Sequence, residues 1–354
     1  MENFASSNVL WIAVIVSTFT AALTLILIVF ICLFRWIFNA ERQSYEIFSN
    51  EWFPILAGVI MGETPKISKE LNQTDKLILL RLWNYWHQSI AGDASVRLKN
   101  FISDIGCNVV ALNLIQNGNR AQKLLSSISL GNLNDSTAWE HLKLLVATDD
   151  QIISLHAARA MLQLNSERAI NELMPMILGR EKWDMSVLTH ILKQSRAVFE
   201  NVIIKAWATF DESQQIRALK LCANLGLSLT EKMLSQLLQM DQRTPLLNAT
   251  LQLLARFPNP VYRLQIVQLF DHPSAFVRAQ AVMAHSSIAD PSDIEILMEM
   301  LHDNDSLTRN NAALTLSQSS SLGIQALRSL KDVLEDPRAY QAVAVTCMRH
   351  ELSA

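Results

Sequence analysis

Histidine is the residue type whose chemistry is easiest to examine in this sequence, because neutral imidazole binds transition metals and titrates near neutral pH. The chain has eight histidines. Among them, His272, His285 and His302 recur near the C-terminus, and His350 is followed directly by Glu351. None of these has the i, i+4 spacing that puts two metal ligands on one helix face. We therefore predict structural or surface histidines and no metal site.

No other pattern in the sequence predicts catalysis. The chain contains no glycine-rich phosphate loop, no nucleophile elbow and no complete HExxH motif. Its four cysteines lie far apart and show neither metal-ligand spacing nor a pairing pattern, which is typical of reduced thiols. The sequence thus predicts a protein that is not an enzyme and that needs no cofactor.

The elements that position these residues are helices arranged in a repeat. The stretch from Asp271 to Asp303 predicts an acidic turn, a helix, a second turn and a second helix, and the stretch from Asp303 to Asp336 has the same order. Two amphipathic helices in a period of about 30 residues are typical of an α-solenoid, whose units bury their apolar faces by stacking. Nine glycines and nine prolines in 354 residues also favour helix throughout. We predict an all-α protein.

The same period can be followed through much of the chain. Near the start of the array, one helix is predicted from about residue 75 to 90 and a second from about 96 to 116. Later helix pairs are predicted to begin near Thr137, Glu167, Ala197, Leu229, Pro260, Ser292 and Gly323.

Two of these units share a motif. Val277-Arg278 is followed by an alanine-rich helix, as is Thr308-Arg309, and an aspartate stands in the turn before each. This motif resembles the HEAT-repeat family. The resemblance implies that the turn aspartates and the arginines stack into ladders between units, which is a structural role. The residues of this predicted ladder are Asp271, Arg278, Asp303, Arg309 and Arg217.

The N-terminal region is strongly apolar. No residue from Val9 to Phe34 is charged, and about 20 apolar residues span a bilayer core. The stretch lacks the basic residues with which a signal peptide begins. It is also longer than the apolar region of a signal peptide. We therefore predict a short extracytoplasmic N-terminus over 1–8 and a transmembrane helix over 9–38. Because Arg35 and Arg42 follow the uncharged stretch and no Lys or Arg precedes it, we expect the C-terminal domain in the cytoplasm and the transmembrane helix in the inner membrane.

Small residues recur along one face of this predicted span. Residues of this kind at every fourth position let two helix backbones approach, and hydroxyl groups can bond across the contact. A plain anchor explains the same residues, so both interpretations stay open. The residues of the possible packing face are Ala13, Ser17, Thr20, Ala21 and Thr24.

Residues 39–74 are predicted to form a juxtamembrane amphipathic segment and linker. The apolar run from Trp52 to Met61 is too short to cross a bilayer. It can lie on the membrane surface, insert into a partner, or cap the first unit of a solenoid that covers 75–354. Capping is favoured, because a terminal repeat must cover its exposed apolar face.

Composition and family resemblance limit the functional classes. The formal net charge is −3 and no basic cluster is visible, which disfavours the nucleic-acid-binding class of HEAT-like proteins. Deoxyhypusine hydroxylases are HEAT-like and bind iron through several His-Glu pairs, whereas this chain has one such pair, at His350. A HEAT-like enzyme anchored to the membrane, either a lyase or a metal-dependent hydroxylase, remains the alternative.

These observations together predict a membrane-tethered scaffold. A solenoid presents a long surface that holds partner proteins, and an anchor raises its concentration near membrane partners. The order of an N-terminal anchor followed by HEAT-like units resembles bacterial accessory proteins associated with membrane glycosyltransferases of polysaccharide export. The resemblance implies that a glycosyltransferase is a possible partner.

Overall fold

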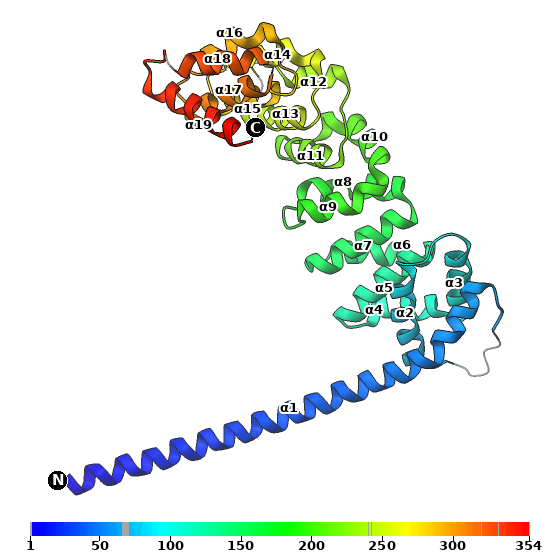
Figure 1. Cartoon of the computed structure of the whole chain (residues 1–354). Coiled ribbons are helices and arrows are strands. Elements are labelled where there is room, and N and C mark those ends of the chain that lie inside the picture. The colour runs from blue at the N-terminus through cyan, green and yellow to red at the C-terminus, as the bar shows by residue number, and fades with distance from the viewer. Residues whose placement is uncertain are drawn as a thin grey trace. The chain divides into compact units, whose positions relative to one another are not determined.

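A computed structural model of the chain describes residues 2–65, 71–239, 241, 243–319, 321–331 and 333–353. Every regular element among these residues is helical, which confirms the predicted all-α class. The chain divides into two compact units, Met1–Leu145 and Val146–Ala354. Each unit is coloured along its sequence in Figure 1 and is treated separately below.

The first unit begins with one long helix and continues with shorter ones. Its helices are α1 (Glu2–Met61), α2 (Gln73–His87), α3 (Asp93–Asp104), α4 (Cys107–Asn117), α5 (Arg120–Leu133) and α6 (Trp139–Val146), with a short 3₁₀ turn at Ser136–Ala138.

The last turns of α1 pack against α2 and α3. Phe48 and Trp52 are buried and stacked, with ring centroids 5.4 Å apart, and the Trp52 ring lies 6.5 Å from that of Phe101 in α3. Leu56 and Val59 continue the same buried stripe. The end of α1 therefore covers the first short helices, as the capping interpretation predicts, and belongs to their core.

The end of α1 is fixed by a side chain from another helix. Arg97 in α3 donates to the carbonyl oxygens of Ile60 at 2.6 Å and Val59 at 3.4 Å. A cation at the last carbonyls of a helix satisfies unpaired acceptors and complements the helix dipole. Gly62 follows with a φ of +98°, a conformation that glycine adopts without a steric penalty.

The sequence-based prediction of one helix over 96–116 is wrong, because the structure has two helices there, α3 and α4. Gly106 lies between them with a φ of +77°, in the left-handed region. A chain that enters this region at a single glycine cannot continue a right-handed helix through it.

The second unit is a stack of helical pairs. Its helices are α7 (Gln151–Leu164), α8 (Ser166–Gly179), α9 (Met185–Leu192), α10 (Arg196–Ala206), α11 (Glu212–Leu225), α12 (Glu231–Leu237), α13 (Thr244–Arg256), α14 (Arg263–Gln268), α15 (Ala275–His285), α16 (Ile294–Met300), α17 (Ser306–Ser319), α18 (Ser321–Lys331) and α19 (Pro337–Ser353). Short 3₁₀ turns lie at Lys193–Ser195, Trp207–Thr209, Pro260–Tyr262, Leu269–Asp271 and Pro291–Asp293.

The helices of this second unit form two rows. In one row, α11, α13, α15, α17 and α19 pack in succession. The helices between them in the chain, α10, α12, α14, α16 and α18, each pack against the helix that follows. Figure 1 shows this first row on the inner side of the curve that the unit describes, with α10, α12, α14 and α16 on the outer side. The arrangement is an α-solenoid, and we call the first row the inner row.

Candidate functional site

The predicted ladder residues lie at the joints between consecutive helical pairs. Arg278 in α15 donates to both carboxylate oxygens of Asp303, from Nε at 2.6 Å and from a terminal nitrogen at 2.9 Å. A paired contact of this geometry is among the stronger ion pairs. The Arg278 guanidinium also lowers the pKa of Asp303, although burial acts in the opposite direction. Arg278 and Asp303 thus join two neighbouring units.

The other predicted ladder residues make different contacts. Arg309 donates to the carbonyl oxygens of Asp303 at 2.7 Å and Asn304 at 3.0 Å, and the Asp271 side chain is exposed outside this network. Arg217 donates to the carbonyls at the end of α8 and beyond it, those of Ile177, Arg180 and Trp183, at 2.7 to 3.1 Å. These arginines satisfy backbone acceptors at turns.

Two further arginines at such joints were missed by the sequence analysis. Arg263 donates to Asp293 in the next pair, with Nε at 2.8 Å. Arg180 donates to the Ser154 hydroxyl at 2.6 Å and to the Val146 carbonyl at 2.8 Å. Arg263 and Asp293 are one repeat period apart, so a search for charges at that spacing would have found them. Arg180 reaches back to the unit at Ile153-Ser154, which lacks the motif arginine.

His285 is the most deeply buried histidine of the array. Its Nε2 atom lies 3.0 Å from Asp293 Oδ2, but the two groups do not have the geometry of a hydrogen bond. The rings of Phe270 and His285 pack in a T-shaped arrangement, with their centroids 5.5 Å apart. Burial lowers the pKa of His285. Burial opposes ionisation of Asp293 too, yet the bonds from Arg263 lower the pKa of this carboxyl. Burial therefore disfavours the charged form of His285, although Asp293 beside it acts in the opposite direction.

The remaining histidines singled out in the sequence have local contacts. His272 Nδ1 accepts a bond from the Ser274 amide at 3.0 Å, and the exposed His302 lies 3.8 Å from Asp336. The side chains of His350 and Glu351 lie outside the described residues. Within the described part of the chain, no three His, Cys, Asp or Glu side chains gather as metal ligands.

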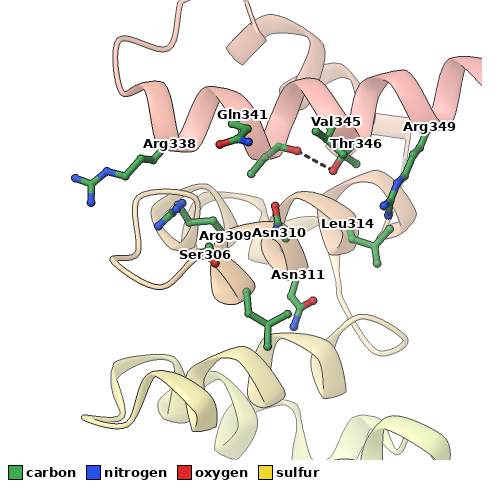
Figure 2. Close-up of a pocket in the computed structure, with 12 residues that line it drawn as sticks. Ser306, Arg309, Asn310, Asn311, Leu314, Arg338, Gln341, Val345, Thr346 and Arg349 are labelled. Carbon is green, nitrogen blue, oxygen red and sulfur yellow. Dashed lines mark hydrogen bonds between the residues drawn. The ribbon is translucent and has the colours of Figure 1, made fainter. Parts of the chain in front are cut away.

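A groove lies on the inner row between α17 and α19. Its volume is about 510 Å³, and Figure 2 shows side chains of both helices facing it. Arg309 and Arg338 are at one end, Leu314 and Arg349 at the other, with polar groups between them. The lining residues are Ser306, Leu307, Arg309, Asn310, Asn311, Leu314, Arg338, Gln341, Ala342, Val345, Thr346 and Arg349. We call this the α17–α19 groove.

The α17–α19 groove combines positive charge with apolar surface. Three of its lining residues are arginines and none is acidic. Leu314 and Val345 are 41% and 42% exposed, which is high for aliphatic side chains in a packed array. Cationic, amide and apolar groups side by side are suited to binding another polypeptide.

The N-terminal part of α1 has different surroundings from the rest of the chain. Residues Val16–Trp36 have a mean hydropathy of 2.5 and none of that window is buried. The segment is long and apolar enough to cross a membrane, and a signal sequence has the same properties. The side chain of Ala13 lies outside the described residues, whereas Ser17, Thr20, Ala21 and Thr24 are exposed on the helix.

The fold and the joints define a class: an α-solenoid of helical pairs linked by arginines. The family is identified for its C-terminal part, where the family model of HEAT repeats matches residues 230–317 and 265–349. This part of the chain therefore consists of HEAT repeats, as the motif at Arg278 and Arg309 predicts. No curated protein matches the sequence.

Proposed function

We propose that this protein is a membrane-tethered, non-catalytic scaffold whose cytoplasmic solenoid binds partner proteins. The N-terminal helix is the anchor, with its N-terminus outside the cell and its C-terminal side in the cytoplasm. Arg35 and Arg42 on that side support the orientation, because cytoplasmic flanks are enriched in Lys and Arg.

The observation that carries the proposal is the pairing of two surfaces that the described protein leaves uncovered. One is the apolar segment Val16–Trp36, which has no buried part. The other is the inner row, where HEAT repeats expose a groove with both charged and apolar side chains. The first surface suits lipid and the second suits protein.

The continuity of α1 supports an anchor over a cleaved signal sequence. The helix runs from Glu2 to Met61 without a break, and its last turns pack in the first unit. Signal peptides end in a short cleavage region of small residues, and this chain instead continues with Arg35 and Trp36 in the helix.

The proposed partner is a membrane-associated protein. Confinement to one membrane raises the effective concentration of two binding partners, so an anchored scaffold acts best on partners in that membrane. The resemblance in architecture to accessory proteins of polysaccharide export makes a membrane glycosyltransferase the first partner to examine.

Affinity purification in mild detergent tests this function. The full-length protein and a version that begins at Glu41 are compared, with co-purifying proteins quantified by mass spectrometry. A stoichiometric partner in both samples is expected if the solenoid binds it. Absence of any stoichiometric partner from the full-length protein, or turnover of a substrate by the purified protein alone, would contradict the scaffold function.

A further inference from the structure

We propose that the concave face of the second unit binds an amphipathic helix of a partner protein, together with an acidic segment that adjoins this helix. The helix lies on the apolar half of the face and the acidic segment on the basic half. This inference rests on the proposed scaffold function and names the chemistry of its partner. A series of exposed side chains, one on each successive helix of the concave side, carries it.

These exposed side chains have the same place in each repeat. Because α7, α9 and α11 contact one another in succession, α7 and α9 extend the inner row. Along this extended row, exposed residues recur 30 to 32 positions apart, which is the period of the solenoid. We call them the inner strip: Arg159, His190, Lys220, Gln252, Met283, Leu314 and Val345. The strip is basic at one end and apolar at the other, so a matching partner changes character along its length.

The apolar half of the inner strip consists of large side chains that stay open. Met283, Leu314 and Val345 are 51%, 41% and 42% exposed. Two helical turns before the first two of them, Phe276 and Leu307 are 50% and 43% exposed on the same helix faces. Figure 2 shows Leu314 and Val345 at the α17–α19 groove, on neighbouring helices. Apolar surface that continues over several helices is typical of a site for protein binding.

The spacing of this apolar half favours a helix as the partner. Packed helices lie about 8 to 10 Å apart, so the exposed side chains of α15, α17 and α19 recur at about that distance. A partner helix that crosses them advances about 10 Å in seven residues and returns to nearly the same face. An extended chain covers the distance in about three residues, which turns successive contacts to opposite faces. Aliphatic residues at every seventh position of a helix therefore match the strip.

The basic half offers cations that the described part of the chain leaves unpaired. Arg159, His190, Lys193 and Lys220 are exposed, and none of them makes a hydrogen bond or an ion pair with a described residue. The first three line a pocket of about 120 Å³ between α7 and α9, and no acidic residue lines it. The ladder arginines differ, because they bond to turn carbonyls or to Asp303. The pocket is thus a place where a carboxylate of the partner can bind.

Acidic side chains are scarce on the concave side. The helices α7, α9, α13, α15 and α17 contain no Asp or Glu, and Glu212 of α11 is paired with Arg243. On the outer side, α10, α12 and α16 each contain at least one Glu. The concave side is therefore positive, although the whole chain has a net charge of −3. Such a surface is complementary to an acidic segment of a partner.

The combination of the two halves favours protein over nucleic acid. A phosphate backbone binds mainly through closely spaced cations, and this electrostatic term supplies most of its affinity. On α15, α17 and α19, the inner strip instead exposes Met283, Leu314 and Val345. Carboxylates followed by an apolar helix face match this order, and a polypeptide supplies both.

Peptide binding to the full-length protein in lipid nanodiscs tests the proposal. The probe is a fluorescein-labelled peptide with the acidic tail Glu-Glu-Ser-Glu-Glu-Ser-Glu-Glu-Ser, followed by three copies of the heptad Leu-Ala-Gln-Leu-Ala-Gln-Gln. An extended tail of this length covers about 30 Å, so it passes α13 and reaches α11 and α9. A second probe carries the tail at the other end, since a helix can cross the row in either direction. Fluorescence polarisation reports binding, and empty nanodiscs give the background.

Two companion peptides separate the two halves of the contact. One replaces every glutamate with glutamine, and the other keeps the composition but distributes the leucines over all faces of the helix. We expect each to bind at least about tenfold more weakly than its parent peptide, because the first loses its charged contacts and the second its apolar face.

Variants of the protein locate the site. Arg159→Glu with Lys220→Glu, and separately Met283→Asp with Leu314→Asp, are each expected to weaken binding at least about tenfold. The matched controls are Lys205→Glu with Lys232→Glu on α10 and α12, and Leu322→Asp with Val333→Asp outside the strip, all at exposed positions. Each control should change affinity less than about twofold. Circular dichroism confirms that every variant is folded.

Several results would overturn the inference. It fails if neither probe binds, if the peptide with distributed leucines binds as tightly as its parent, if the controls lose as much affinity as the strip variants, or if an oligothymidylate of twenty nucleotides binds more tightly than both probes. If a partner co-purifies equally with the wild type and with both strip variants, the scaffold function stands and the inner-strip proposal fails. Binding of a probe without any co-purifying partner supports the inner strip and counts against the scaffold function.

Discussion

The two apolar parts of helix α1 differ in how their side chains are arranged around the helix. In Val16–Trp36, apolar residues occupy every face and none of the segment is buried. In the last turns, the buried side chains form one stripe, Phe48, Trp52, Leu56 and Val59, while Phe53 beside them is 57% exposed. Both parts belong to one continuous helix.

This difference teaches that the pattern of apolar residues, more than their number, identifies the environment of a helix. A helix that is apolar all round fits a uniformly apolar medium, whereas a single stripe fits a protein surface on one side. Helix α1 therefore links a segment suited to lipid directly to a segment that is part of a folded core. Four predictions test this contrast, beginning with the largest effect.

Charges in the middle of the first segment should abolish membrane association. Ile26→Arg combined with Ile28→Arg places two charges near the centre of the span. Each costs about 2.5 to 3.5 kcal/mol for membrane insertion. We expect the variant to move from the membrane fraction to the soluble fraction in a flotation assay. The matched variant Ile26→Ala with Ile28→Ala should still float, and flotation of the arginine variant would contradict the anchor.

Truncation of the buried ring in the second segment should destabilise the first unit. Trp52 is 4% exposed and packs on Phe48 and Phe101, so Trp52→Ala is expected to cost about 3 to 5 kcal/mol. Faster hydrogen exchange in α2 and α3 would report the loss, with membrane association unchanged.

The neighbouring ring provides the control for this prediction. The rings of Phe53 and Trp86 form a T-shaped pair with centroids 4.8 Å apart, but Phe53 stays largely exposed. Phe53→Ala should therefore lower the free energy of unfolding by only about 1 kcal/mol. Equal effects of the two substitutions would show that the last turns of α1 have no preferred buried face.

Removal of the side chain that caps α1 should have a smaller effect. Arg97 bonds to the carbonyls of Ile60 and Val59 from a partly exposed position. We expect Arg97→Met to cost about 1 kcal/mol, because the methionine keeps the aliphatic stem and loses the charged bonds. Faster hydrogen exchange at the end of α1 would measure this loss of stability. The control Arg81→Met, at an exposed position of α2, should leave the exchange rate there unchanged.

The smallest effect is expected on the face of small residues in the span. Thr20 donates to the carbonyls of Val16 and Ser17, and Thr24 donates to that of Thr20, at 2.8 to 3.0 Å. Their hydroxyls are satisfied within the helix, so Thr20→Val with Thr24→Val should leave flotation unchanged. Chemical cross-linking in membranes checks for a paired helix. Loss of a cross-linked dimer in the variant would show that this face packs against another helix.

The sequence predicted the helical pairs well, because their period and their breakers are local features. The observed starts of α8, α10, α12 and α18 lie close to the positions predicted from spacing alone. The break at Gly106 was missed, because a glycine inside a helical pattern does not reveal whether it takes a positive φ. Arg180 was missed as well, because its acceptors lie in the preceding helical pair and follow no motif.

The α17–α19 groove could not be predicted from the sequence at all. Arg309 was read as a ladder residue, and it does bond to turn carbonyls, but its position beside Arg338 depends on how α17 packs against α19. Helix boundaries read from a sequence are uncertain by about two to four residues, which is enough to rotate a side chain to another face. A surface of this kind therefore becomes visible only in three dimensions.

Site-specific photo-cross-linking in intact membranes tests the central claim most directly. A photoreactive benzoyl-phenylalanine replaces Val345 in the groove or, as a control, Leu322, which is exposed on α18 and does not line the groove. The scaffold account predicts one dominant cross-linked protein from position 345 and none from position 322. The same products from both positions, or no product from position 345, would contradict a membrane-tethered scaffold that binds its partner on the inner row.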